Sequence, residues 1–398
     1  MSPVAAIFLI VLVDVCSFTL VIPLLPLYAE RLSASPLQAT LLVSTFALFQ
    51  LLSGPMLGRL SDKVGRKPVL ILSQIGTLIG LLVLARAQSL WVVYLARAID
   101  GATAGNISLA QAYISDHTKP QDRAKSFSYI FIAFGIGFFI GPLATGLLAG
   151  YGLAVPIYAG AGLSLLSIVV TAVLLPREEK VAPPREGGAS AGVARAMFDW
   201  RGYLAYFKRP VLQGLFAEML FFGFCFANFT SGIALFDERR FTWKGHPFGA
   251  REIAFHFAII GLFGIILQAG LVGRLVRRFR EPRLVRAGFV SLVVGYMALA
   301  LIHSTPLLVV VTVLTVFGHG ILRPTLGSLV TQNAGKHEQG VVLGISQSIA
   351  SLSQVAAPVV CGLLISRGHL FHWSYLAAIV ALFGIVAARR GSARHGEA

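Results

Sequence analysis

Charged side chains are scarce in this sequence. Asp, Glu, Lys and Arg together make up 13 % of it, whereas about a quarter of the residues are charged in typical soluble domains. Hydrophobic residues make up 56 %, and the mean hydropathy is +0.78. This composition excludes an ordinary soluble globular protein and predicts a protein that lies in a membrane.

Acidic residues are scarcer than basic ones, with 17 Asp and Glu against 33 Lys and Arg and a formal net charge of +16. In a soluble protein such a balance would indicate nucleic acid as a partner. Here the basic clusters at 59–67, 177–209 and 274–286 all fall in loops on one side of the predicted membrane segments. By the positive-inside rule these loops and both termini are cytoplasmic. We therefore expect a lipid bilayer and no nucleic acid as the partner of these charges, and a bacterial inner membrane as the location.

Cysteines and catalytic motifs are also few. The three cysteines, Cys16, Cys225 and Cys361, lie in apolar runs without CxxC spacing, so we interpret them as small core residues. The sequence contains neither the Gly-x-x-x-x-Gly-Lys-Ser/Thr loop that binds nucleotide phosphates nor the His-Glu-x-x-His zinc motif. We expect no enzyme activity, no metal and no cofactor.

Long apolar runs separated by short polar breaks fill the chain. A helix needs about 20 apolar residues to cross the hydrocarbon core, and about twelve runs meet this length. We therefore predict an all-α integral membrane protein with twelve transmembrane helices. The predicted spans are 4–29, 37–58, 69–87, 90–115, 126–149, 154–175, 210–235, 253–272, 284–303, 306–332, 341–366 and 372–389.

Two motifs recur half a chain apart. The basic loop from Gly58 to Pro68 has a weaker copy from Gly273 to Pro282, and Pro142–Gly146 matches Pro358–Gly362 at nearly the same offset. Such duplication is typical of secondary transporters. It predicts two pseudo-symmetric six-helix bundles, 1–176 and 210–398, joined by a cytoplasmic linker, 177–209, whose end from 197 is an amphipathic helix on the inner leaflet.

Ionisable residues inside the predicted helices are the first candidates for function, because such residues are costly in a bilayer and usually line a cavity or find partners. In the first half these are Asp14, Arg97 and Asp100, and Gln111 continues the polar face of the helix that holds Arg97. Asp14 either carries a proton or substrate, or forms a structural ion pair with Arg97. Both alternatives remain open at this stage.

The second half offers a similar set. Glu218 and Arg323 share a depth in the cytoplasmic half of the bilayer, where they could form a pair, and His319 lies one turn from Arg323. Gln347 and Gln354 lie on one polar face of the span 341–366.

The loop Gly58-Arg59-Leu60-Ser61-Asp62-Lys63-Val64-Gly65-Arg66-Lys67 resembles the signature loop of the major facilitator superfamily. Arg97–Gly101 is similar to the helix 4 motif of that family. The helix 5 motif of its drug:proton antiporters is matched by Gly135, Gly137, Gly141, Pro142 and Gly146. The stretches Ala112–Asp116 and Ser351–Pro358 resemble the tetracycline-efflux branch most closely.

This resemblance implies a cytoplasmic latch, which includes Gly58, Gly65 and Lys67. Asp62 would lie at the start of the helix near Val341, and Arg66 would bridge to Asp116 and on toward Arg123. It also implies a proton-coupled secondary transporter that exports amphipathic drugs or related small molecules by alternating access, and we expect it to work as a monomer. The alternatives are an organic-anion or metabolite carrier on the same fold and, less favoured, a membrane sensor that does not transport.

Overall fold

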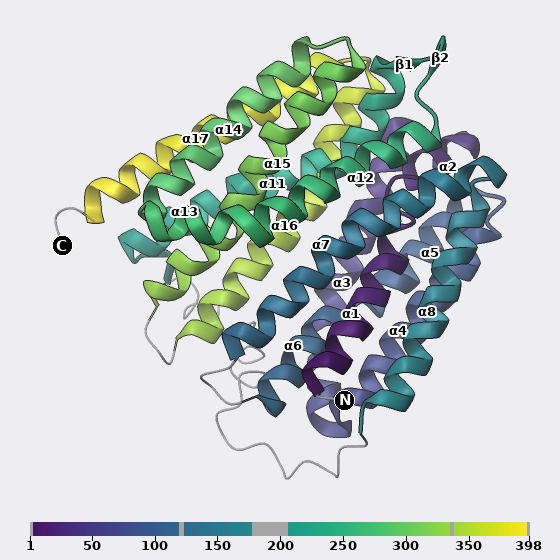
Figure 1. Ribbon diagram of the computed structural model, residues 1–398, viewed down its shortest axis with the longest axis horizontal. Coiled ribbons are helices and arrows are strands. Elements are labelled where there is room, and N and C mark those ends of the chain that lie inside the picture. The colour runs from purple at the N-terminus through teal and green to yellow at the C-terminus, as the bar shows by residue number, and fades with distance from the viewer. Residues whose placement is uncertain (1–2, 119–122, 177–205, 335–337, 396–398) are drawn as a thin grey trace. The chain divides into compact units, whose positions relative to one another are not determined.

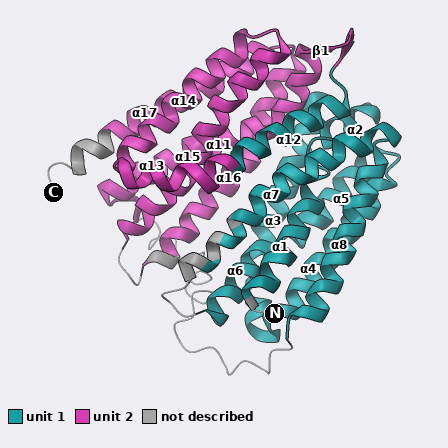
Figure 2. Cartoon of the chain, in the orientation of Figure 1, with its two compact units in different colours: residues 1–190, 248–265 teal, residues 191–247, 266–398 magenta. Residues whose placement is uncertain are grey.

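The computed structural model describes residues 3–118, 123–176, 206–334 and 338–395. The chain forms two compact units, one of Met1–Ser190 with Phe248–Ile265 and one of Ala191–Pro247 with Ile266–Ala398 (Figure 2). The predicted division at a linker, 177–209, stays a prediction, because its first 29 residues and most of the predicted amphipathic helix lie outside the described ranges.

The described residues contain ten helices that are long and apolar enough to cross a membrane. The chain is therefore an all-α integral membrane protein (Figure 1). These ten spans are Pro36–Val64, Arg66–Ala85, Ile132–Tyr151, Ala154–Leu174, Pro210–Arg240, Ala250–Arg278, Glu281–Leu301, Thr305–Gln332, Val341–Ser366 and Leu370–Arg389.

The two remaining predicted spans are not continuous helices, so the count of twelve spans stays a prediction. The segment 4–29 is broken into α1 (Pro3–Thr19) and α2 (Leu25–Arg31), with Pro23 in the turn between them. Proline has no backbone N–H to continue a helix and disfavours helical geometry in the residue before it. The segment 90–115 is broken into α5 (Leu90–Ala102) and α6 (Asn106–His117).

A side chain of a neighbouring helix supports the break between α5 and α6. The hydroxyl of Ser73, on α4 (Arg66–Ala85), accepts a hydrogen bond from the backbone N–H of Gly105 at 2.9 Å and donates to the carbonyl of Thr103. The Thr103 hydroxyl in turn donates to the carbonyl of Ile99 at 2.9 Å. Backbone groups freed by the break are thus paired inside the protein, as a nonpolar surrounding requires.

The first unit is built around α1, which packs against α7 (Arg123–Leu148) and α8 (Ala154–Leu174). Glycines of α7 allow this close approach: the Thr19 hydroxyl donates to the carbonyl of Gly137 at 2.8 Å, and a Cβ on Gly141 would lie 2.0 Å from the Thr19 oxygen. Gly141 therefore cannot carry a side chain without displacing α1. Pro142 lies inside the same helix.

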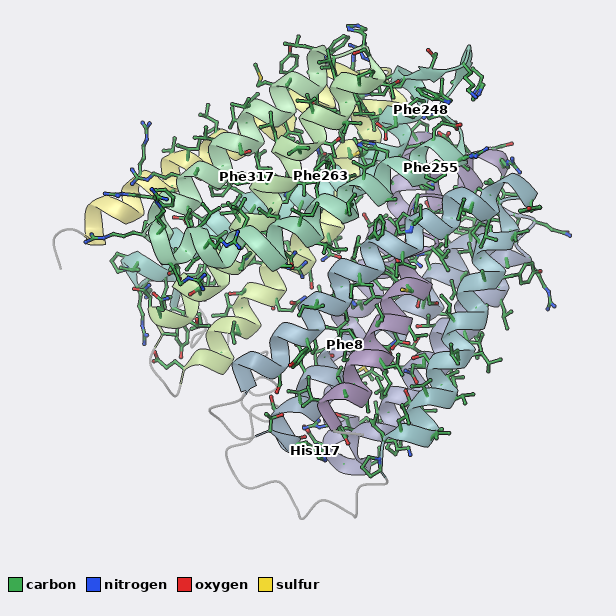
Figure 3. All side chains as sticks on the ribbon, in the orientation of Figure 1. Phe8, His117, Phe248, Phe255, Phe263 and Phe317 are labelled. Carbon is green, nitrogen blue, oxygen red and sulfur yellow. The ribbon has the colours of Figure 1, made fainter. Side chains whose placement is uncertain are left out.

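The opposite side of α7 contacts α12 (Ala250–Ile266) within the same unit. Gly146 lies against Phe255, which Figure 3 labels, and Gly135 lies against Ile265. A Cβ on Gly261 of α12 would lie 2.2 Å from the carbonyl oxygen of Phe138. The four glycines of the predicted helix 5 motif thus lie where α7 contacts α1 and α12.

The second unit is built around α11 (Pro210–Arg240), which packs against α15 (Thr305–Gln332), α16 (Gln339–Ser366) and α17 (Leu370–His395). Its large buried side chains include Trp373 and Phe289. The unit also contains α14 (Glu281–Leu301), and α12 continues as a π-helical turn, Leu267–Leu271, and α13 (Val272–Arg278).

Helix α11 ends five residues later than the predicted 235. Arg240, in its last turn, donates to the carbonyls of Ile302 and Ala300 at 3.1 and 3.2 Å and lies over the ring of Phe371 at 4.5 Å. These contacts hold the extra turn. A short hairpin of β1 (Thr242–Trp243) and β2 (His246–Pro247) follows it.

A side chain at Gly141 is expected to destabilise the first unit. In Gly141→Ala the new methyl group would overlap Thr19, and overpacking of this kind costs about 1–3 kcal/mol. The matched control is Gly162→Ala on α8, where a Cβ would meet nothing within 4 Å. Thermal unfolding in detergent, followed by loss of the monodisperse peak on size exclusion, should show a lower midpoint for Gly141→Ala only. Equal midpoints would contradict the close packing of α7 on α1.

Candidate functional site

A basic cluster lies where α3 (Pro36–Val64) passes into α4 through Gly65, whose φ of 96° favours glycine. The Arg66 guanidinium contacts Asp116 of α6 at 2.9 Å, Asp62 of α3 at 2.5 Å and the hydroxyl of Ser61 at 2.6 Å. One arginine therefore ties together three helix ends of the first unit. Gly58 lies one turn before Asp62, and its carbonyl accepts a hydrogen bond from the Ser61 hydroxyl.

Lys67 extends this cluster to α8. Its Nζ donates to the carbonyls of Ala172, at 2.7 Å, and Leu175, where α8 ends. A cation at a helix C-terminus pairs with carbonyls that have no partner within the helix and is favoured by the helix dipole. The predicted partner Arg123 has a side chain outside the described part of the chain, and the contact of Asp62 with the helix near Val341 stays a prediction.

Asp14, on α1, lies among neutral hydrogen-bond donors. The Nε2 of Gln74, on α4, lies 3.3 and 3.5 Å from its two carboxylate oxygens, and the side chains of Ser167 and Asn106 also donate to the carboxylate. Gln74 is fully buried, and its Nε2 lies 2.8 Å from the Ser167 hydroxyl and 2.9 Å from the Thr171 hydroxyl. Four helices therefore contribute to the surroundings of this one carboxylate.

Arg97 and Asp100 form a buried ion pair on α5, with 2.8 Å between Nη1 and Oδ2 and relative exposures of 6 % and 5 %. Thr77 donates a hydrogen bond to Asp100, and the Arg97 guanidinium lies 4.4 Å from the ring centre of Phe46. Among the ion pairs of the described residues, Arg97 is joined to Asp100 and not to Asp14. The alternative of a structural Asp14–Arg97 pair is therefore not what the structure contains.

The break at Thr103–Gly105 separates this pair from the polar residues that follow. Arg97 lies on α5 and the half-buried Gln111 lies on α6, so the polar face predicted from Arg97 to Gln111 does not run along one continuous helix. The predicted span 90–115 required an unbroken helix, and this prediction was wrong.

Within the described ranges, the predicted polar residues of the second unit are not joined by an ion pair like that of Arg97 and Asp100. No ion pair joins Glu218 and Arg323 in the part of the chain that the structure describes, so the predicted pair is not formed. Glu218 is buried on α11, while the Arg323 side chain is exposed on α15. Equal depth along the two helices did not bring the two side chains into contact.

His319 lies one turn before Arg323, among aromatic rings. Its Nε2 lies 3.0 Å from the hydroxyl of Tyr296, and the ring contacts Phe222, Phe226 and Phe229 of α11. On α16, Gln347 is exposed and Gln354 is half-buried. The sequence placed these residues in one cavity, and that role stays a prediction.

Sequence reasoning missed Gln74, Asn106, Ser167, Thr171 and Tyr296. A signal for two of them was present, because Ser164, Ser167 and Thr171 recur at helical spacing in an otherwise apolar span. All three are buried, which indicates that this polar stripe faces the interior of the unit. Among the described residues no group of three or more His, Cys, Asp or Glu side chains is arranged to hold a metal ion.

Membrane-spanning helices, buried ionisable groups and a basic loop tied to neighbouring helix ends are features of secondary transporters. Comparison with known proteins agrees: the sequence profile of the Major Facilitator Superfamily matches residues 7–358 and 271–390. The chain belongs to the Major Facilitator Superfamily, and it is a transporter rather than an enzyme.

Characterised relatives cover almost the whole chain. The class C tetracycline resistance protein of Escherichia coli is 29 % identical over 395 residues, 96 % of this chain and 95 % of that protein. Multidrug resistance protein 2 of Bacillus subtilis is 24 % identical over 368 residues, covering 92 % and 89 %.

Solved structures share the fold. The human organic anion transporter MFSD10 has a TM-score of 0.71 and 22 % identity, with 97 % of this chain and 98 % of that chain covered. The peptide transporter POT in complex with sulfate has a TM-score of 0.77 and 17 % identity, covering 98 % and 94 %.

Replacing Gln74 is expected to destabilise the first unit. Gln74→Leu would keep the volume but leave Asp14 and the hydroxyls of Ser167 and Thr171 without their shared donor, which costs about 1–3 kcal/mol. Gln213→Leu, at an exposed position of α11, is the control. Thermal unfolding in detergent should show a lower midpoint only for Gln74→Leu. A midpoint equal to that of the wild type would mean that the amide does not serve these groups.

The Arg97–Asp100 pair gives a second prediction. Removing one partner leaves an uncompensated buried charge and costs about 3–5 kcal/mol, whereas replacing both by apolar residues is often nearly neutral. Arg97→Leu and Asp100→Leu should therefore each lower the unfolding midpoint strongly, and the double variant should recover most of the loss. A double variant as unstable as the sum of the two single variants would show that the two residues are not coupled.

Proposed function

We propose that this protein is a proton-coupled exporter of amphipathic drugs or related small organic molecules, and that Asp14 carries the proton. The observation that carries this assignment is the character of its partners. Gln74, Ser167 and Asn106 are all neutral, so protonation of Asp14 breaks no ion pair. Asp100 is held by Arg97 at 2.8 Å, so protonation there would leave a buried arginine uncompensated.

The hydrogen-bond donors and acceptors around Asp14 suit both protonation states. A carboxylate accepts from the Gln74 amide and the Ser167 hydroxyl. After protonation its O–H needs an acceptor, and the Gln74 Oε1 is a buried oxygen without a partner. Rotation of the amide by half a turn would present this oxygen to the new O–H group. The site therefore accommodates a proton without a change in helix packing.

The nature of the substrate is supported by the relatives. Proteins named for tetracycline resistance and multidrug resistance match this chain over most of its length. From these names we infer that this protein exports drugs. The organic-anion or metabolite carrier (symporter or facilitator), which the sequence left as an alternative, is not favoured by these matches.

In the proposed cycle, a proton from outside binds Asp14 as substrate leaves outward, and the protein then reorients to release the proton inside. Each proton that crosses 100 mV supplies about 2.3 kcal/mol. We propose that Arg66 with Asp62 and Asp116 acts as the cytoplasmic latch in this cycle, together with Arg123 and the contact of Asp62 near Val341. The close contacts of Gly137 and Gly141 with α1 support an intact α1–α7 interface during the change.

The remaining properties follow from this proposal. The protein would lie in a bacterial inner membrane with both termini in the cytoplasm and act as a monomer. It would use the proton gradient in place of a cofactor.

Proton antiport can be tested with inside-out vesicles and a pH-sensitive dye. Adding ethidium, an amphipathic drug, should release protons from vesicles that contain the wild-type protein, and Asp14→Asn should abolish this release. Cys16→Ser, two residues away on α1, is the matched control and should keep it.

Full drug-dependent proton release by purified Asp14→Asn protein would disprove the role of Asp14. No release for ethidium or any other drug tested would disprove antiport itself.

A further inference from the structure

An aromatic cluster in the second unit has one closed end and one open end. The ring of His319 lies 6.0, 5.4 and 5.6 Å from the ring centres of Phe222, Phe226 and Phe229. Phe229 is buried, whereas Phe222 and Phe226 are partly exposed. The three phenylalanines recur at helical spacing, so they share one face of α11.

The hydrogen bonds of His319 fix which ring nitrogen is free. The Tyr296 hydroxyl has one hydrogen, which it donates to the carbonyl of Cys225 at 2.9 Å. It must therefore accept from the Nε2–H of His319 at 3.0 Å. The Nδ1 of His319 is then an acceptor, and it is buried without a partner. The cluster thus contains an unused hydrogen-bond acceptor.

Two charged side chains lie at the open end. Glu218 is one turn before Phe222 on α11, and Arg323 is one turn after His319 on α15. Successive spans alternate in direction, so α11 and α15 run antiparallel. Each charged residue lies one helical turn, about 5.4 Å along its helix, from a member of the cluster, and both lie toward the same end of the cluster. Among the described residues, neither side chain has a hydrogen-bonding or ion-pair partner.

Glu218 and Arg323 differ in whether they can lose their charge when they lack a partner. A carboxyl group can take up a proton and become neutral, but an arginine stays charged. Arg323 is therefore the fixed, uncompensated charge of this face, and its planar guanidinium suits a carboxylate, which it can bind through two parallel hydrogen bonds. The first unit differs, because its buried arginine is already paired with Asp100.

We propose that this face of the second unit, formed by Arg323, His319, Phe222 and Phe226, binds drugs that consist of an aromatic ring with a carboxylate group. The carboxylate pairs with Arg323, and the ring packs on Phe222 and Phe226. A hydrogen-bond donor on the ligand, where present, reaches the Nδ1 of His319. This inference rests on the proposed export function and assigns it a class of substrate.

Binding to purified protein in lipid nanodiscs tests the assignment. The probes are nalidixic acid, an aromatic carboxylate, and its methyl ester, which keeps the ring and lacks the charge. The wild-type protein should bind the acid at least about tenfold more tightly than the ester, as expected for a hydrogen-bonded ion pair. Arg323→Gln should weaken binding of the acid by about tenfold or more and leave that of the ester unchanged. Phe222→Leu should weaken both by about threefold.

Controls separate this result from misfolding. Arg367→Gln removes an exposed arginine beyond the end of α16 and should bind the acid like the wild type. Arg323→Lys keeps the positive charge but loses the planar guanidinium group that can form two parallel hydrogen bonds. Its affinity for the acid should therefore lie between those of the wild type and Arg323→Gln. Equal affinity for acid and ester, or equal losses in Arg323→Gln and Arg367→Gln, would overturn the proposed site.

Transport in proteoliposomes distinguishes failure of this site from failure of the proposed function. Export of one carboxylate anion in exchange for one proton moves a net two positive charges inward. A proton exchanged for the cation ethidium moves no net charge. An inside-negative potential should therefore accelerate nalidixic acid export and leave one-for-one ethidium exchange unchanged.

Ethidium exchange that depends on Asp14, without any nalidixic acid export, would refute the inference and keep the proposed function. If neither compound moves protons, the proposed function fails as well.

Discussion

Compensation of each charge inside a nonpolar surrounding is the constraint on which this structure depends. The first unit meets it within its own helices. A carboxylate on α1 is surrounded by amides and a hydroxyl, and the arginine on α5 is neutralised three residues later on the same helix. The carboxylate of Asp14 needs short distances between helices, and the buried Asp100 is closely packed against a neighbouring helix as well. These distances exist because small residues such as Gly80 lie against Asp100, where a Cβ would come within 3.1 Å of the Asp100 side chain.

The second unit contains charged and polar groups that are not compensated by any residue that the structure describes. Its basic group on α15 and its acidic group on α11 are not joined, and its histidine keeps one free nitrogen. Groups that are unsatisfied in the protein alone are suited to a partner that comes and goes. In the roles proposed above, the carboxyl group of Asp14 in the first unit takes the proton, and the fixed positive charge of Arg323 in the second unit binds the substrate. Coupling between them would then require communication between units rather than competition for one residue.

Much of the fold could be predicted from hydropathy, because a run of about 20 apolar residues has few other stable arrangements. The signature loop was equally informative, and the structure places Arg66 against Asp116. The breaks in the first and fourth predicted spans could not be found this way. The second of them depends on Ser73, which lies far from Gly105 in sequence and supplies the missing hydrogen bonds. Depth along a helix likewise gave no information on whether two side chains meet, so Glu218 and Arg323 were expected to pair and do not. Gln74 was missed because its partners Ser167 and Thr171 lie on a helix more than ninety residues away.

The interruption between α5 and α6 has a mechanical consequence. The N–H of Gly105 and the carbonyl of Thr103 are bonded to the side chain of Ser73 on α4. The N–H of Thr103 still bonds to the carbonyl of Ile99, and the N–H of Leu109 bonds to that of Gly105, so each short helix keeps its own backbone hydrogen bonds on its side of the joint. A change in the angle between α5 and α6 would leave the pair Arg97–Asp100 intact, because both residues lie on α5. Asn106 begins α6 and donates to Asp14, so a small rotation of α6 alone would add or remove one donor at that carboxylate. A pivot next to Asn106 would thus link a movement of α6 to the readiness of the Asp14 carboxylate to take a proton.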